Sequence, residues 1–263
     1  MNLGWRLSAL KNGLQDATAY RIEFLFEILG SAFVPAAIQW VLWYALFVTG
    51  KSQEIAGMSY SDMLHYTFVS LLFTQVRGGD HDFRLQELIR NGQLSNYLLR
   101  PVSVVEFIYI RGVAPRLFIA GICLVIAVLA GFYFELSTGR ILGGMFLALI
   151  GNVIHFQIGA ILSTVAFLWE EAFSILMVKN MLVTLLSGEL IPLNLFPVTM
   201  QWIWKVTPFY LYVFGPTQYA LGRWSHVEYI HSLQIALLWL IVNWILIQIT
   251  WGLGIKRYLS LGG

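Results

Sequence analysis

Four stretches of this chain run for at least 18 residues without an Asp, Glu, Lys or Arg. They cover residues 28–50, 117–134, 141–168 and 232–254. About 20 apolar residues in a helix are enough to cross the hydrocarbon core of a bilayer. Within one such segment only a helix satisfies all the backbone hydrogen-bonding groups. We therefore expect an all-α polytopic membrane protein.

Composition excludes a soluble domain. Of the 263 residues, 58% are hydrophobic and 11% are charged, whereas soluble domains carry roughly 25% charged residues. So few charges cannot cover a water-facing surface, and we treat residues 1–263 as a single membrane domain. The single cysteine, Cys123, lies in an apolar run, which excludes an intrachain disulfide and a thiolate metal cluster.

Hydropathy predicts six transmembrane helices. The second has to be extended at both ends, because only 14 residues, Met63 to Val76, separate Asp62 from Arg77. Without it, the charged segment that follows would face outward. The predicted spans are residues 20–48, 58–79, 104–134, 141–168, 172–191 and 232–254.

Two further segments are expected to lie at the membrane surfaces. Four leucines near the N-terminus share one narrow helical face, which is typical of an amphipathic helix in the interface. Between the fifth and sixth spans, four prolines interrupt an aromatic-rich interval and predict short, broken helices in the outer leaflet. The leucines are Leu3, Leu7, Leu10 and Leu14, and the prolines are Pro192, Pro197, Pro208 and Pro216.

The predicted fourth span carries a stripe of small residues. Gly144, Ala148, Gly151, Gly159 and Ser163 recur at steps of three, four and eight residues. Such a stripe lets another helix approach closely. Asn152, His155 and Gln157 are polar residues of the same span, and they serve either in hydrogen bonds between helices or in handling substrate or protons.

The most charged segment, residues 82–106, lies between the second and third spans. Its pattern predicts a short helix that Asp82 caps and Gly92 ends, with one apolar and one charged side. A compact helix between two spans is expected to dock a partner; the alternative is a solvated loop that follows the positive-inside rule. The candidate docking residues are Asp82, Phe83, Arg84, Leu85, Glu87, Leu88, Arg90 and Gly92.

Two motifs carry a resemblance to a known family. Residues 89–103, IRNGQLSNYLLRPVS, resemble the cytosolic segment of ABC-2 type transporter permeases that precedes the third span. Residues 185–197, LLSGELIPLNLFP, resemble the segment that follows the family's fifth span. The two motifs occur in the family's order. The motif residues singled out are Tyr97, Arg100, Pro101, Gly188, Pro192 and Pro197.

The resemblance implies the membrane-spanning permease of an ATP-binding-cassette exporter. A separate ATPase dimer would bind ATP and Mg and dock on the helix that begins at Asp82. A second copy of this chain, or a related permease, would complete the transporter. The sequence itself offers no nucleotide site, because Gly50-Lys51-Ser52 has Ala45 where a phosphate-binding loop requires its first Gly. We expect no cofactor on this chain and no nucleic-acid partner, and membrane lipids around it.

Polar residues inside the predicted spans are candidates for a substrate pathway. They are Gln39, Lys179 and Asn180. Lys179 stands about 10 Å into its span at 1.5 Å per residue, so it either faces protein or water or extends its ammonium group back to the interface. The scarcity of charges inside the spans favours an amphipathic small molecule, a lipid-like compound or a peptide as substrate.

Charge asymmetry predicts the orientation. With both termini inside, twelve Lys and Arg lie on the cytosolic side and four outside, which accounts for all sixteen and follows the positive-inside rule. We therefore place the chain in a bacterial inner membrane with both termini cytosolic. Two alternative functions are an intramembrane enzyme, for which no H-E-x-x-H pair is present, and a membrane scaffold that does not transport.

Overall fold

The regular structure of the protein is helical among the residues that are described. The computed structural model describes residues 3–19, 21–78, 81–169 and 172–260, and its β structure there is limited to one isolated bridge, Ile55 to Met58. The expectation of an all-α fold is therefore confirmed. The longer helices are α1 (Leu3–Ala19), α2 (Arg21–Tyr44), α3 (Tyr60–Arg77), α6 (Val104–Tyr133), α7 (Thr138–Ser163), α8 (Ala172–Leu186) and α11 (His226–Ser260).

The remaining helical segments are short and lie at the two ends of the bundle. The short α-helices are α4 (His81–Arg90), α5 (Ser95–Leu98), α9 (Gln201–Val206) and α10 (Phe214–Ala220). A π-helical turn, Ala45–Thr49, extends α2, and a 3-10 turn, Thr164–Phe167, extends α7. Further 3-10 turns are Leu193–Leu195, Val198–Met200 and Phe209–Leu211.

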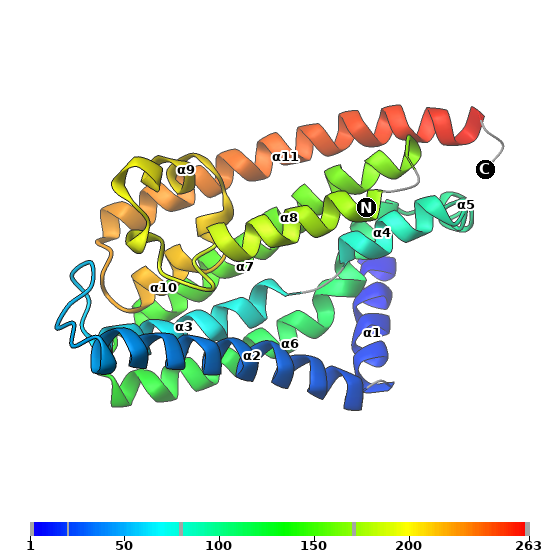
Figure 1. Cartoon of the computed structure of the whole chain (residues 1–263). Helices are drawn as coiled ribbons and strands as arrows, with labels where there is room; N and C mark the ends of the chain where they lie inside the picture. The colour runs from blue at the N-terminus through cyan, green and yellow to red at the C-terminus, as the bar shows by residue number, and fades with distance from the viewer. Residues whose placement is uncertain (1–2, 20, 79–80, 170–171, 261–263) are drawn as a thin grey trace.

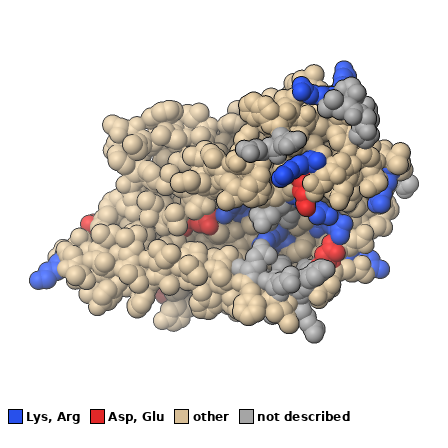
Figure 2. Space-filling model, turned by 45° about the vertical axis from the view of Figure 1, so that its right-hand side comes forward, with Lys and Arg blue, Asp and Glu red and all other residues tan. Residues whose placement is uncertain are grey.

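The long helices lie side by side along one axis, and the two ends of the bundle differ (Figure 1). At one end lie α1, which crosses the bundle axis, together with α4, α5 and the end of α11; we call it the charged end. At the other lie α9, α10 and the loop after α2; we call it the aromatic end. Figure 2 shows Lys and Arg side chains gathered toward the charged end.

Four helices among the described residues are long and apolar enough to cross a membrane. They are Leu29–Thr49, Val104–Tyr133, Thr138–Phe167 and His226–Tyr258. Large apolar side chains such as Phe118, Leu129 and Phe132 are exposed on the outside of α6, as contact with lipid requires. The chain is a membrane protein.

The predicted count of six spans stays a prediction, because α3 and α8 are not among these four. α3 spans 18 residues, and its polar residues Thr67, Ser70 and Thr74 are buried inside the protein. α8 has 15 residues, about 22 Å of helix at 1.5 Å per residue. Both run beside α7 (Figure 1).

The segment after α8 is broken as expected, but it begins earlier than predicted. The predicted fifth span, 172–191, is too long because α8 ends at Leu186. Gly188 adopts φ +82°, and the carbonyl of Ser187 accepts a hydrogen bond from the Phe214 backbone N–H at 2.8 Å. These contacts turn the chain back on itself. Every residue of α10 is buried, so this segment belongs to the core of the aromatic end.

The small-residue stripe on α7 does bring other backbones close. A β-carbon on Gly144 would lie 2.8 Å from the Pro216 carbonyl oxygen of α10, and one on Gly151 would lie 2.8 Å from the Leu211 carbonyl oxygen. A β-carbon on Gly159 would overlap the Asp82 side chain of α4. The stripe therefore gives α7 close contact with both ends of the structure, and this prediction is confirmed.

α1 packs across the first turns of α6. Arg6 pairs with Glu106 at 2.7 Å, and Asp16 pairs with Arg111 at 2.8 Å. Between these pairs Gly13 packs against the backbone of Arg111, and a β-carbon on Gly13 would overlap the Arg111 carbonyl oxygen. Two leucines of the face predicted for this helix, Leu7 and Leu14, are 64% and 37% exposed, which leaves them available to the membrane interface.

The close contact at Gly13 is testable by comparison with another glycine of α1. Gly4→Ala should leave thermal stability unchanged or raise it by up to about 1 kcal/mol, because Ala favours helices and nothing lies within 4 Å of its β-carbon. Gly13→Ala should lower the melting temperature of the purified protein in detergent, because its β-carbon overlaps the Arg111 carbonyl. Equal melting temperatures for the two variants would contradict this packing.

Candidate functional site

The helix α4 is docked on its own chain through its apolar side. Leu85 and Leu88 are at most 1% exposed, and they share a core with Phe156 and Ala160 of α7 and Phe167 of the turn that follows it. The expectation that Leu85 and Leu88 are docking residues for a partner is therefore wrong. Amphipathicity showed that this side is buried, and the chain itself buries it.

The exposed side of α4 is charged. Arg84, Glu87 and Arg90 are exposed, and Arg84 pairs with Glu87 at 3.0 Å within the helix. Phe83 is half-buried, with its ring centroid 5.2 Å from that of Phe173 of α8. Gly92 is exposed and adopts φ +68° just beyond the end of α4, as the pattern predicted. These residues are the part of α4 that a partner can contact.

Asp82 has a different role from the one predicted. α4 begins one residue earlier, at His81, and Asp82 is buried in its first turn, where its carboxylate forms an ion pair with Lys179 of α8. Its backbone carbonyl accepts a hydrogen bond from Ser163 Oγ at 2.8 Å. The absence of a side chain on Gly159 makes room for it. Asp82 thus fastens α4 to both α7 and α8.

Lys179 is buried inside the chain, 4% exposed. Besides its ion pair with Asp82, its Nζ lies 3.4 Å from Nε2 of His155 on α7. The Lys179 ammonium group therefore faces protein and does not extend back to the interface. A charge at this depth is tolerated because an opposite charge and hydrogen-bonding groups surround it. The interpretation of Lys179 as a pathway residue stays a prediction.

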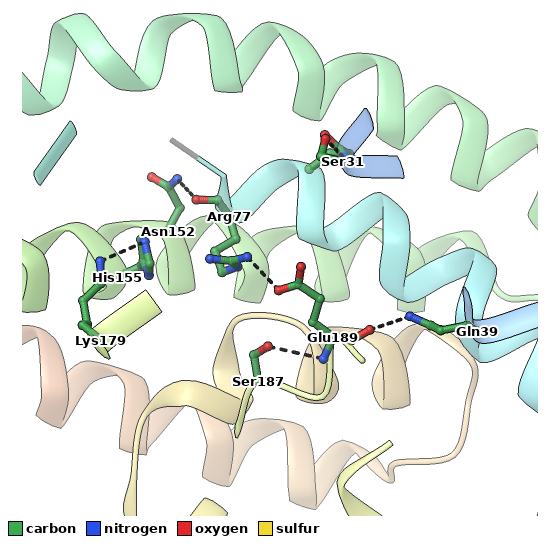
Figure 3. Close-up of polar contacts among 9 residues, drawn as sticks. Ser31, Gln39, Arg77, Asn152, His155, Lys179, Ser187 and Glu189 are labelled. Carbon is green, nitrogen blue, oxygen red and sulfur yellow. Dashed lines mark hydrogen bonds and ion pairs between the residues drawn. The ribbon is translucent and has the colours of Figure 1, made fainter. Parts of the chain in front are cut away.

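A second buried cluster surrounds Glu189, in the turn after α8. Its carboxylate pairs with Arg77 at the end of α3 at 2.7 Å, and both side chains are at most 13% exposed. Its backbone carbonyl accepts a hydrogen bond from Gln39 Nε2 of α2 at 2.7 Å (Figure 3). Gln39 accepts in turn from Thr67 Oγ1 at 2.9 Å, and Thr67 accepts from Trp43 Nε1 at 2.9 Å. The cluster joins α2, α3 and the segment after α8.

Asn152 connects the two clusters along α7. Its Nδ2 donates to the carbonyls of Val76 and Arg77 at 3.1 and 3.2 Å, which satisfies the last turn of α3. Its Oδ1 accepts from Tyr109 of α6 at 3.0 Å. His155 lies one turn further along α7, beside Lys179 (Figure 3). The interpretation that Asn152 forms hydrogen bonds between helices is confirmed.

A polar cavity of about 230 Å³ lies among α2, α3, α6, α7 and α8. Asn180 lines it, and its Oδ1, like Thr74 Oγ1, is buried without a hydrogen-bond partner among the described residues. Figure 2 shows charged side chains along a recess on this side of the molecule. Water occupies about 30 Å³ per molecule, so the cavity has room for several waters or for a small polar group. Its lining is Ser31, Thr74, Gln75, Arg77, Gly78, Arg116, His155, Asn180, Thr184 and Glu189.

Of the three candidate pathway residues, only Asn180 lines this cavity. Gln39 is 1% exposed and used in hydrogen bonds, and Lys179 is used in its ion pair. Arg77, Arg116 and Glu189, which the sequence interpretation left out, contribute its charged lining. Glu189 lies within the motif of residues 185–197. An acidic residue in an otherwise apolar motif was the sequence signal that could have identified it as a site residue.

The remaining motif residues shape two connections. The Arg100 guanidinium lies 5.4 Å from the Tyr97 ring centroid, and Pro101 is exposed just before Ser103. Ser103 Oγ caps α6 by accepting the Glu106 N–H at 3.4 Å. In the second motif Pro192 is buried and Pro197 is exposed at the start of a 3-10 turn. The Gly188 carbonyl accepts from Tyr66 at 2.7 Å, so this motif holds the turn that carries Glu189.

Comparison with known proteins identifies the family. A family model described as ABC-2 family transporter protein matches residues 33–262, which is 230 of the 263 residues. The match begins within α2 and includes both buried clusters and every residue that lines the polar cavity except Ser31. No curated protein matches the chain.

The Asp82–Lys179 pair predicts a distinctive pattern of stability. Lys179→Met leaves a carboxylate buried without its partner and should lower the stability of the purified protein by about 3–5 kcal/mol. Adding Asp82→Asn to Lys179→Met should restore most of this loss, because no buried charge remains. Thermal unfolding in detergent measures both.

Arg84→Met is the matched control, since it also breaks an ion pair of α4 but an exposed one. It should change stability by no more than about 0.5 kcal/mol. If the double variant is as unstable as Lys179→Met alone, the ion pair is not what holds α4.

Proposed function

The chain belongs to the ABC-2 family of transporters and is therefore a membrane permease, and we propose that a separate ATP-binding-cassette ATPase dimer drives it as an exporter. In this proposal ATP and Mg are bound by the ATPase, and this chain binds no cofactor. The observation that carries the proposal is the way in which α4 is attached to α7 and α8. α4 is a short helix with a charged exposed side, fastened to α7 and α8 by buried contacts.

The proposed contact with the ATPase is the exposed side of α4, formed by Arg84, Glu87 and Arg90. A displacement of α4 would carry α8 with it, because separating Asp82 from Lys179 would leave two buried charges without partners. α8 carries Asn180 and Thr184 of the polar cavity. Nucleotide-driven motion at α4 would thus alter the cavity, and a few differential contacts are enough to bias two transport states.

The proposed substrate is an amphipathic small molecule, a lipid-like compound or a peptide. The cavity offers it a polar environment beside Arg77, Glu189 and Asn180. The outside of α2 offers an apolar one, because Phe33 and Ile38 are exposed there. We propose that two permeases, either two copies of this chain or this chain and a related one, form the path between them, with α2, α3 and α8 lining it.

The proposed topology has six spans, with α3 and α8 as the second and fifth. The charged end faces the cytosol of a bacterial cell and the aromatic end faces outward, so both termini are cytosolic. The asymmetry of twelve against four Lys and Arg supports this orientation. This count includes Arg21 on the cytosolic side and Lys205 on the outer side, although the side chains of both lie outside the described residues.

Cysteine labelling tests the topology. In a Cys123→Ala background, Gln53→Cys in the loop after α2 should react with a membrane-impermeant maleimide added to intact cells. Gln93→Cys beyond α4 should react only after the cells are permeabilised. Both positions are exposed in the structure, so reactivity depends on the side of the membrane. Labelling of Gln93→Cys from outside would reverse the orientation.

Charge reversal tests the contact with the ATPase. Arg84→Glu with Arg90→Glu should weaken copurification of the ATPase about five- to thirtyfold, if each exposed pair contributes up to about 1 kcal/mol. ATPase stimulation by the permease should fall in parallel. Lys11→Glu with Lys256→Glu makes the same change of charge on exposed residues of α1 and α11 and should leave both measurements unchanged.

A parallel experiment distinguishes the charged side of α4 from its apolar side. Leu85→Asp with Leu88→Asp should cause loss of the permease itself, because both leucines are buried in its own core. Normal permease levels with loss of the ATPase in this variant would instead assign the leucines to the partner. Wild-type copurification by the Arg84→Glu and Arg90→Glu variant would remove α4 as the contact.

A further inference from the structure

A second pocket, of about 310 Å³, lies at the aromatic end of the molecule and shares no lining residue with the polar cavity. It is formed by α9, the 3-10 turn after it, and the first turns of α11. Its lining is Trp204, Tyr210, Trp224, Glu228, His231, Ser232 and Ile235. Three aromatic rings and one carboxylate therefore surround a space that the proposed function leaves unused.

The aromatic walls are held in place by one another. Trp204 and Tyr210 have ring centroids 5.6 Å apart at 63°, and Tyr210 and Trp224 have theirs 6.2 Å apart at 63°. Phe214 of α10 contacts both tryptophans edge-to-face, at 5.5 and 5.9 Å. The backbone of Trp224 is fixed because Arg140 donates to its carbonyl at 2.8 Å. The rings are thus preorganised and would need little ordering when a ligand binds.

The carboxylate of the pocket is held in a defined position. Glu228 Oε2 accepts from the Ser225 N–H at 2.7 Å and from Ser225 Oγ at 2.9 Å. Ser225 Oγ accepts in return from the Glu228 N–H at 3.3 Å, so the two form a capping box at the start of α11. Within the described residues, Oε1 of Glu228 takes part in no hydrogen bond. Glu228 therefore presents a fixed negative charge beside the aromatic rings.

We propose that this pocket binds an organic ammonium group, such as the trimethylammonium group of choline. Aromatic faces attract cations through the ring quadrupole, and cages of this kind recognise quaternary ammonium ligands. The Glu228 carboxylate adds a direct charge interaction and disfavours anions. A bare metal ion would require several oxygen ligands, which tryptophan rings do not supply. The ligand class follows from the combination of rings and acid.

The size and position of the pocket favour the headgroup of a larger molecule. Its volume is at the lower end of the range of about 300–1,000 Å³ for small-molecule sites. Val227 and Ile230 of α11 lie next to it along the helix and are 76% and 54% exposed, so an apolar tail has a surface to lie on. The ammonium group is supplied either by a lipid headgroup or by a free amine. This inference goes beyond the proposed function and does not depend on the ATPase.

The test measures binding of radiolabelled choline to the purified full chain in dodecyl maltoside, a detergent without a choline group. The uncharged competitor 3,3-dimethylbutan-1-ol has the shape of choline with carbon in place of nitrogen. We expect saturable choline binding, and competition by this alcohol at least about tenfold weaker than by unlabelled choline, which corresponds to about 1.4 kcal/mol. Equal competition by the two, or no saturable binding of choline, would overturn the proposal.

Three variants identify the groups that bind. Glu228→Gln removes the charge but keeps an acceptor for the capping box, and it should weaken choline binding by about tenfold or more without changing the melting temperature. Trp224→Leu should abolish binding. Trp202→Leu is the matched control, because Trp202 is 62% exposed and does not line the pocket, and it should bind like the wild type.

Wild-type affinity in Glu228→Gln would contradict the proposal even if Trp224→Leu fails to fold. Competition by short-chain phosphatidylcholine below its micellar concentration identifies the source of the ammonium group. If it competes better than choline, the pocket takes a lipid headgroup; if choline competes better, it takes a free amine. Either result supports an ammonium site.

Discussion

The ion pair between Asp82 and Lys179 is the interaction on which the arrangement of the charged end depends. Moving either charge out of water alone costs several kcal/mol, so neither side chain can be buried without the other. The surroundings lower that cost further, because His155 lies beside the ammonium group and Gly159 makes room for the carboxylate. α4 can therefore take its place only when α7 and α8 are already in theirs. Apolar contacts give α4 its affinity for the bundle, and the charge pair sets its position along α7.

This arrangement gives the two sides of α4 different roles: the apolar side packs in the permease core, and the charged side is left for a partner. The permease core uses the leucines, and a partner would meet only a row of charged side chains with Gly92 at its end. Exposed ion pairs are weak individually, at roughly 0–1 kcal/mol. A stable complex would thus need contacts beyond α4, and α5 lies at the same end (Figure 1). Association that depends on charges is also sensitive to salt.

Local patterns in the sequence predicted much of the fold. The end of α4 just before Gly92, the close packing along Gly144, Gly151 and Gly159, and the broken segment after α8 all follow from residue types at short spacing. Contacts between distant residues did not follow, because Asp82 is 97 residues from Lys179 and Arg77 is 112 from Glu189. Amphipathicity indicates that one side of a helix is covered and does not say by what. For α3, polar residues that face protein lower its hydropathy, so membrane length and hydropathy alone do not identify it as a span.

The complete burial of α10 gives the bundle a mechanical asymmetry. α10 is wedged against α3, α7 and α11 at the aromatic end, where Gly144 of α7 contacts its backbone. α4 is fastened to the same helix at Gly159, 15 residues further along, or about 22 Å at 1.5 Å per residue. α7 therefore links the wedge at α10 to Asp82 of α4, and α3, α6, α8 and α11 pack along it. The side chains midway between the two contacts are those of Asn152 and His155, so a displacement of α4 that α7 follows would reach them before it reaches α10.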